Sequence, residues 1–175
     1  TSVAAWAPHS TYPVTCAAVA TCTVSSLDMA TDNVYDITFE TDVASAADVV
    51  YMRVNARSTA GDYGYTGQRT AHDATEVIFG TNSATEAQLY GTTTATHKTF
   101  GGQIRCQDGN SAGRQMTCNF VVHATGDPND TSRNYSATGG FSTAQAVGNM
   151  TSFNLALWGG ATVNWRIHVA KVTTP

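Results

Sequence analysis

The sequence has few charged residues: Asp, Glu, Lys and Arg together make up 13% of its 175 residues. The basic residues are scattered singly, none precedes Arg53, and the formal net charge is −4. Proteins that package or read nucleic acid present clustered Lys and Arg to the phosphate backbone. We therefore expect no nucleic-acid partner, and a genome-packaging coat protein with a basic arm is disfavoured.

A long apolar run is also missing. No window approaches the about 18 to 20 apolar residues that a membrane-spanning helix requires. The first residues have neither the charged n-region nor the apolar h-region of a signal peptide. We expect no membrane partner, and a length of 175 residues fits a single domain.

Signatures of catalysis and of metal binding are scarce. No Ser or Cys lies in a recognisable nucleophile motif, and the five histidines are far apart in the sequence. The stretch Asp127–Asp130 lacks the acidic ladder of a calcium loop. The carboxylates that could pair in a glycosidase fall where outward-facing residues are expected: Asp36, Glu40, Asp62, Glu76 and Glu86. We expect no enzyme, no catalytic or metal-binding residues and no cofactor.

The residues that dominate the chain are Thr, Ala, Ser, Gly, Asn and Val, which suit short strands and turns. Tyr35, Ile37 and Phe39 alternate with polar residues, as in a strand with one buried face. Further strands are expected at 49–55, 76–79, 87–90, 97–106, 115–124, 152–158 and 163–172. About eight such strands predict an all-β fold, an antiparallel two-sheet β-sandwich of jelly-roll type.

Glycine-rich stretches mark the expected turns and loops. Turns are predicted at Gly80–Asn82, Asp108–Asn110 and Gly159–Gly160. Ser58–Asp73 and Gly126–Gly148 show no alternation, so we expect two long, neighbouring loops there. The last strands should form a hairpin from Phe153 to Val172, with Trp158 and Trp165 in core or interface packing.

Residues 1–30 differ in composition from the rest. Two prolines in an Ala/Ser/Thr-rich stretch favour extended backbone. We expect an extended N-terminal arm over residues 1–30, with one short strand near Thr21–Ser25, and a sandwich over 31–175. The arm supplies four candidates for contact with a capsid: Trp6, Pro8, Tyr12 and Pro13.

The four cysteines fall into two local pairs, Cys16 with Cys22 and Cys106 with Cys118. Neither pair has the spacing of a zinc site. The first interpretation is two local disulfides, with Cys106 and Cys118 opposite each other in a hairpin. The alternative is that all four are buried thiols that behave as small hydrophobic residues.

The order of motifs resembles the small jelly-roll domains of bacteriophage virion proteins, which occur in capsid-decorating proteins and at the tips of tail fibres. The resemblance covers about residues 33–172. It rests on these stretches: Tyr35–Glu40, Val50–Val54, Gly61–Tyr65, Phe79–Asn82, Gln88–Gly91, Thr96–Gly102, Gly139–Gly140 and Met150–Leu155. It implies a non-enzymatic virion protein, assembled in the host cytoplasm and located on the virion surface, and a homotrimer.

Three functions remain open. The first is a capsid decoration or cement protein whose arm binds the major capsid protein or other virion proteins. The second is a receptor-binding tip that recognises a host glycan, with Tyr63, Tyr65 and Asn134 as candidate contacts. The third is a secreted carbohydrate-binding module, for which sequons at Asn129, Asn134 and Asn149 would have meaning.

Overall fold

The computed structural model describes residues 5–8, 13–32, 34–42, 49–70, 76–91, 97–108, 115–126 and 134–173. Helical segments in these ranges are short, namely α1 (Met29–Asp32) and the 3-10 turns η1 (Gln145–Val147) and η2 (Trp158–Gly160), and none could cross a membrane. The strands are β1 (Ala5–Pro8), β2 (Val14–Val19), β3 (Thr21–Val24), β4 (Val34–Thr41), β5 (Val49–Val54), β6 (Tyr63–Thr70), β7 (Glu76–Ala84), β8 (Ala87–Gly91), β9 (His97–Gln107), β10 (Thr117–Gly126), β11 (Asn134–Thr143), β12 (Phe153–Leu157) and β13 (Val163–Thr173).

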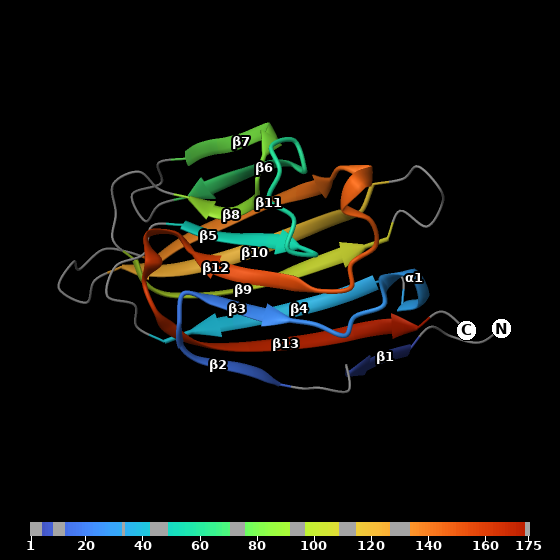
Figure 1. The fold of residues 1–175 in the computed structure, drawn as a ribbon. Coiled ribbons are helices and arrows are strands. Elements are labelled where there is room, and N and C mark those ends of the chain that lie inside the picture. Colours follow the sequence, from blue (N-terminus) through green and yellow to red (C-terminus); the bar gives the residue numbers. More distant parts are fainter. Residues whose placement is uncertain are drawn as a thin grey trace.

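The strands form two antiparallel sheets that lie on each other (Figure 1). Within the described ranges the larger sheet has nine strands in the order β1-β13-β4-β9-β10-β11-β6-β7, and β2 also pairs with β13. The smaller sheet has four, in the order β3-β12-β5-β8. The predicted antiparallel two-sheet sandwich is confirmed.

The strand order is that of a jelly roll with additions. Eight strands taken along the chain, β3 to β9 and then β12, supply the two interlocked Greek keys. Counted one to eight along the chain, strands 1, 8, 3 and 6 form the smaller sheet, which are β3, β12, β5 and β8. Strands 2, 7, 4 and 5, which are β4, β9, β6 and β7, follow in that order in the larger sheet. Strands β10 and β11 are inserted before the fourth, and β13 with β1 and β2 widens the opposite edge.

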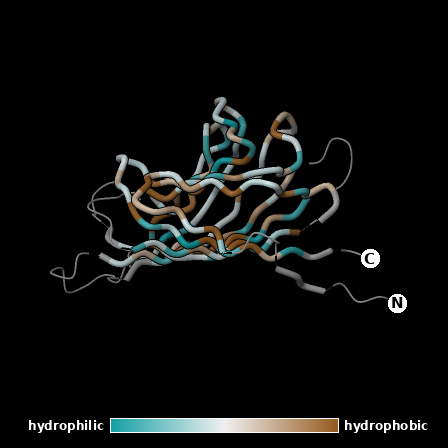
Figure 2. The backbone as a smooth tube through the Cα atoms, turned by 60° about the horizontal axis from the view of Figure 1, so that its bottom comes forward, coloured by the Kyte–Doolittle hydropathy of each residue, from teal (hydrophilic) through white to brown (hydrophobic). Residues whose placement is uncertain are grey.

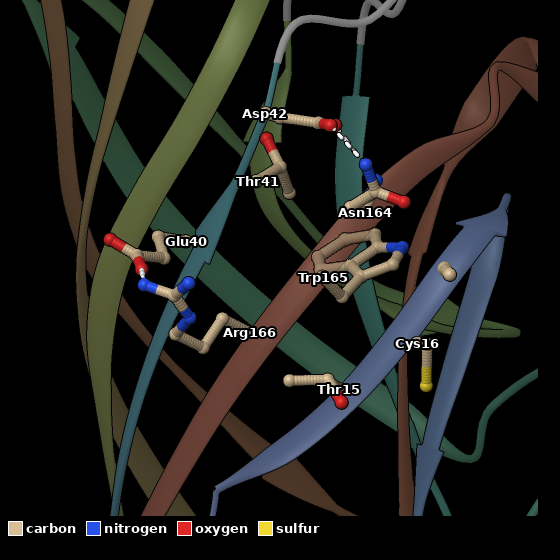
Figure 3. A pocket seen from close by; sticks show the side chains of 9 residues that line it. Thr15, Cys16, Glu40, Thr41, Asp42, Asn164, Trp165 and Arg166 are labelled. Carbon is tan, nitrogen blue, oxygen red and sulfur yellow. Dashed lines mark hydrogen bonds and ion pairs between the residues drawn. The ribbon is translucent and has the colours of Figure 1, made fainter.

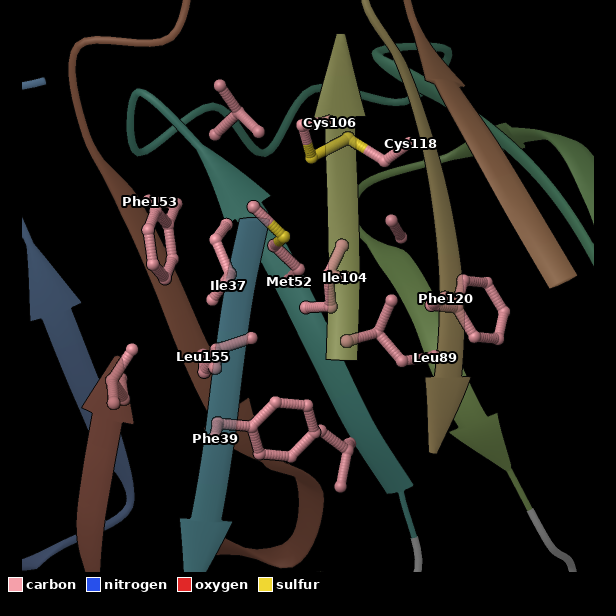
Figure 4. Packing of buried hydrophobic residues seen from close by; sticks show 14 of the residues in the cluster. Ile37, Phe39, Met52, Leu89, Ile104, Cys106, Cys118, Phe120, Phe153 and Leu155 are labelled. Atoms are coloured by element: carbon pink, nitrogen blue, oxygen red, sulfur yellow. A yellow bond between two sulfur atoms is a disulfide. The ribbon is translucent and has the colours of Figure 1, made fainter. Parts of the chain in front are cut away.

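One apolar core fills the space between the sheets. In β4 the side chains of Tyr35, Ile37 and Phe39 are buried, as the alternation predicts. They pack with residues of β5, β8, β9, β10 and β12, among them Met52, Leu89, Ile104, Phe120, Phe153 and Leu155 (Figure 4). Figure 2 shows the same layers from another side, with hydrophobic stretches concentrated in the body of the sandwich.

The N-terminal segment belongs to the sandwich where the structure describes it, which corrects the predicted arm. Strand β1 pairs with β13, so that Trp6 lies opposite Val172 and Pro8 opposite Ala170. Strands β2 and β3 join different sheets. Core side chains of this segment include Cys22, Val24, Leu27 and Met29. These residues are separated by small polar residues, so the segment has one buried face. Its overall composition does not indicate that face.

Two predicted loops contain paired strands instead. Strand β6 lies in the predicted loop 58–73 and β11 in the predicted loop 126–148, and the two pair with each other. Gly67 and Gly139 are direct partners, and a Cβ at Gly139 would lie 2.6 Å from the ring of Phe120. The rings of Phe79 and Phe120, which belong to adjacent strands, fill the space beside Gly67 and Gly139 on the inward face. The usual alternation of apolar and polar side chains is therefore missing from β6 and β11. Gly80–Asn82, predicted as a turn, likewise lies within β7.

The predicted hairpin from Phe153 to Val172 is also wrong. Both strands exist, but β12 belongs to the smaller sheet and β13 to the larger one. The intervening residues Trp158–Gly160 form η2, in which Gly159 and Gly160 have positive φ angles of 86° and 73°. This turn therefore carries the chain from one sheet to the other.

Both local disulfides are present. Cys106 and Cys118 are cross-strand partners in β9 and β10, with Cα atoms 4.0 Å apart. Cys16 of β2 is bonded to Cys22 of β3, with Cα atoms 5.7 Å apart. This second bond joins the two sheets. The interpretation of the cysteines as two local pairs is confirmed, and none of the four is free.

Candidate functional site

Tyr63 is not a surface residue, contrary to its predicted contact with a glycan. It is fully buried at the start of β6. Its hydroxyl accepts a hydrogen bond from the Val54 N–H at 2.7 Å and can donate to the Arg57 carbonyl at 3.2 Å. Burial raises the pKa of Tyr63 to about 12. Its role is structural, because it connects β6 of the larger sheet to β5 of the smaller one.

Tyr65 and Asn134, the other two predicted glycan contacts, lie far from each other. Tyr65 of β6 is half-buried and is the cross-strand partner of Phe141, near the end of β11, whereas Asn134 is the first residue of β11. The Asn134 side chain lies outside the described residues, as do those of Tyr12 and the sequon residue Asn129. Pro13 and Asn149 are exposed. The structure therefore retains only Tyr65 from the predicted aromatic site.

Tyr65 borders a hollow of about 320 Å³ between the curled end of β7 and the outer face of β5 and β8. Small-ligand sites usually have volumes of about 300–1,000 Å³. A register shift between Tyr63 and Tyr65 bends β7 at this place. The lining combines aromatic, amide, carboxylate and hydroxyl groups: Val49, Tyr51, Tyr65, Thr81, Ser83, Ala84, Thr85, Glu86, Gln88 and Trp158. We call this the Trp158 hollow.

Trp158 is the unusual member of this lining. Its side chain is 60% exposed, whereas Trp165 is almost completely buried and packs on Phe39. The positive φ angles of Gly159 and Gly160 form the turn that begins at Trp158. An exposed indole beside polar groups offers a flat apolar face and an N–H donor to an amphipathic ligand. The prediction of core or interface packing holds for Trp165, and the exposure of Trp158 was missed.

Polar groups around the Trp158 hollow are held by short contacts. Arg53 Nη2 donates to Glu86 Oε2 at 2.7 Å, and the Arg53 guanidinium lies 5.1 Å from the centre of the Tyr51 ring. The hydrogen bond to Glu86 raises the pKa of Arg53. The Tyr65 hydroxyl donates to Gln88 Oε1 at 2.7 Å. Burial, followed by the Glu86 charge, raises the pKa of Tyr65, so this hydroxyl remains a donor.

A second hollow, of about 380 Å³, lies over β13 (Figure 3). Its polar side chains bond mainly with one another. Arg166 Nη1 donates to Glu40 Oε1 at 2.8 Å, and the Asn164 N–H donates to Asp42 Oδ1 at 2.7 Å. Trp165 forms part of the floor but is buried. We interpret these contacts as fastening the end of β4 to β13, while the Ala18 N–H of β2 donates to Asn164 Oδ1 at 2.9 Å.

A third, wide groove of about 760 Å³ crosses β6, β7, β10 and β11. The described residues of its lining carry mostly glycine, hydroxyl and amide groups, and no charged side chain is among them. Ile78 on its margin is 81% exposed. Among the described residues, its lining has neither an exposed indole nor a carboxylate, the two groups that distinguish the Trp158 hollow.

The carboxylates predicted to be solvated differ in their environments. Glu40 and Glu76 are exposed, Asp36 and Glu86 are partly buried, and Asp62 is buried. Asp62 accepts from the Thr59 N–H at 2.8 Å and pairs with Arg57 at 3.2 Å. Burial alone would raise the pKa of Asp62, but these two contacts hold it below its usual value. Among the described residues, no three His, Cys, Asp or Glu side chains lie close enough together to hold a metal ion.

Comparisons with known proteins give no family for the chain. No protein-family model matches it, and neither does any curated protein. Among solved structures it is similar to the galectin LEC-6 of Caenorhabditis elegans, with 11% identity over 97% of this chain and 96% of that one and a TM-score of 0.34. It is also similar to VP2 of infectious bursal disease virus, with 13% identity over 94% of this chain but 41% of that one and a TM-score of 0.19. Likenesses of this strength say nothing of what the chain binds or assembles with.

Proposed function

We propose that this chain is a non-enzymatic carbohydrate-binding β-sandwich displayed on the surface of a virus particle. The observation that carries the proposal is Trp158, a largely exposed indole beside a hollow lined by carboxylate, amide and hydroxyl groups. The location on a virion follows from the resemblance to phage jelly-roll domains in motif order. Attachment there would be to the major capsid protein or to another virion protein.

The chemistry of the Trp158 hollow suits a sugar. One face of a pyranose ring carries mainly C–H groups and can lie on an indole or phenol ring, while its hydroxyls both donate and accept hydrogen bonds. Trp158, Tyr51 and Tyr65 supply aromatic surface. Glu86 and Gln88 supply an acceptor and a donor beside it. A hydrophobic ligand would leave these polar groups without partners, which is costly.

The hypothesis of a cement protein with a gripping arm receives less support. It requires residues 1–30 to leave the sandwich and lie across neighbouring shell subunits. In the described residues of this segment, β1, β2 and β3 are paired within the sandwich. The receptor-binding hypothesis needs no such arm. We therefore favour glycan recognition, through the Trp158 hollow in place of the predicted set of Tyr63, Tyr65 and Asn134.

A glycan array with the purified chain tests this proposal. The wild-type chain should bind a subset of glycans, and Trp158→Ala should weaken that binding by about fivefold or more, since stacking on an aromatic ring contributes about 1 kcal/mol. Val121→Ala is the matched control, because Val121 is also an exposed apolar residue but lies on the outer face of β10. Binding that survives Trp158→Ala unchanged, or no binding to any glycan, would contradict the proposal.

A further inference from the structure

Glu86 has one carboxylate oxygen engaged and one available. Oε2 accepts hydrogen bonds from Arg53 Nη2 at 2.7 Å and from the Thr85 hydroxyl at 3.0 Å. Oε1 accepts none from the described residues. The Glu86 side chain is 18% exposed and lines the Trp158 hollow. A partly buried carboxylate oxygen without a donor favours a ligand that brings one.

Gln88 offers the complementary group. Its Oε1 accepts from the Tyr65 hydroxyl, which fixes the orientation of the amide. The Gln88 Nε2 then carries two N–H donors, for which the described residues provide no acceptor. Gln88 and Glu86 follow each other closely on the same border of the hollow. An acceptor and a donor are thus presented together, beside the indole of Trp158.

Charge decides which ligand fits this arrangement. Among the described residues that line the Trp158 hollow, Glu86 is the one charged side chain. Arg53 forms an ion pair with Glu86 but does not itself line the hollow, so a ligand there meets the carboxylate at shorter range than the guanidinium. An anionic ligand would place a second negative charge near a partly desolvated carboxylate, and like charges at short range repel strongly where water is partly excluded.

We propose that the Trp158 hollow selects neutral sugars and rejects sugar acids. One hydroxyl of the sugar donates to Glu86 Oε1, a neighbouring hydroxyl accepts from Gln88 Nε2, and a C–H face of the ring lies on Trp158. Arg53 is a positioning residue, because it holds Glu86 in place without lining the hollow. This inference rests on the proposed function and specifies its class of ligand.

Pairs of sugars that differ only at C6 test the selection. The methyl glycosides of glucose, galactose and mannose are each compared with the methyl glycoside of the corresponding uronic acid, in the same anomeric configuration, by NMR titration of the wild-type chain. At least one neutral sugar should bind about tenfold or more tightly than its uronate. A uronate that binds as tightly as its neutral partner would overturn the selection but leave carbohydrate binding intact. Failure of all six sugars and of the glycan array would instead overturn the proposed function.

Two variants locate the origin of the preference. Glu86→Gln keeps the shape of the side chain and removes its charge, so the preference for the neutral sugar should vanish or reverse as Arg53 loses its counter-charge. Thr85→Ala removes a hydrogen bond to Glu86 but keeps the charge, so the preference should persist. Circular dichroism confirms that each variant is folded. An unchanged preference in folded Glu86→Gln would assign the selection to another group, and the wild-type comparison stands if a variant fails to fold.

Discussion

The hydroxyl of Tyr63 connects the two sheets through the backbone of β5. Tyr63→Phe would keep the ring but leave the buried Val54 N–H without its acceptor. We expect this variant to lose about 1–3 kcal/mol of unfolding free energy, the usual cost of a buried polar group without a partner. Urea denaturation at neutral pH measures the loss. Equal midpoints for the wild type and Tyr63→Phe would show that the bond contributes nothing.

The Tyr63 hydroxyl also makes the difference in unfolding free energy between the wild type and Tyr63→Phe depend on pH. The pKa of Tyr63 rises from 10.0 to about 12 in the folded chain. A raised pKa contributes stability that is present below the unfolded value and is lost as the pH rises through the folded value. The stability advantage of the wild type over Tyr63→Phe should therefore shrink between about pH 10 and pH 12. An advantage that stays constant over this interval would contradict the assignment.

Gly67 of β6 and Gly139 of β11 are direct partners and allow these two strands of the larger sheet to lie close together. A Cβ at Gly139 would lie 2.3 Å from the Thr66 carbonyl oxygen and 2.7 Å from the Cα of Gly67. Both neighbours are backbone atoms, so the strands themselves would have to separate. We expect Gly139→Ala to destabilise the chain by about 1–3 kcal/mol or more. Thermal unfolding is the measurement.

Gly101→Ala is the control on the same sheet. A Cβ there would meet only the Phe39 carbonyl oxygen, at an ordinary 3.5 Å. Because alanine restricts the unfolded chain more than glycine does, this variant should be neutral or slightly more stable. Comparable losses in both variants would mean that the clash at Gly139 is not the cause.

Among the elements, the N-terminal strands contribute to both sheets. Deletion of residues 1–30 would remove β1, β2 and β3 together with Cys22, Val24, Leu27 and Met29 of the core. We expect the truncated chain to lose cooperative thermal unfolding. Deletion of residues 1–8 removes β1 at the edge alone and should leave a folded domain. A cooperative transition in the chain that begins at residue 31 would restore the hypothesis of a separate arm.

Elements with regular alternation were predictable from the sequence, and elements built around glycine were not. Strands β4, β5 and β13 have buried apolar residues at every second position, and their predicted ranges agree with the structure to within about one or two residues. In β6 and β11 the inward positions include Gly67 and Gly139, whose space is filled by rings from other strands. No local pattern reports such a contact, because its partners are distant in the sequence.

The candidate site was only partly predictable for a related reason. Tyr65 was identified as an aromatic contact, but Glu86 and Gln88 were not connected with it. Their proximity depends on the pairing of β5 with β8 and on the bend in β7. The one local signal was Trp158 followed by two glycines, a pattern that places a large aromatic residue at a tight turn. Such a turn leaves little backbone nearby to cover the ring.

For the whole molecule, the homotrimer implied by the resemblance stays a prediction. Strand β7 ends the larger sheet among the described strands, and Ile78 on it is 81% exposed. Closed cyclic assembly covers such edges. Sedimentation at micromolar concentration should show trimers, and Ile78→Asp should shift them toward monomers, whereas Val121→Asp on the sheet face should not. A wild-type chain that sediments only as a monomer would contradict this.

The antiparallel pairing of β1 with β13 has a mechanical consequence. Ala5 lies opposite Thr173, so the described ends of the chain are at the same end of the sandwich (Figure 1). A load that pulls these two ends apart would open the β1–β13 bonds one after another instead of straining them all at once. Peeling could then continue along β2 only as far as Cys16, whose disulfide passes the tension to Cys22 in the other sheet. The β1 edge would therefore open at low force, while the Cys16–Cys22 disulfide keeps the two sheets joined.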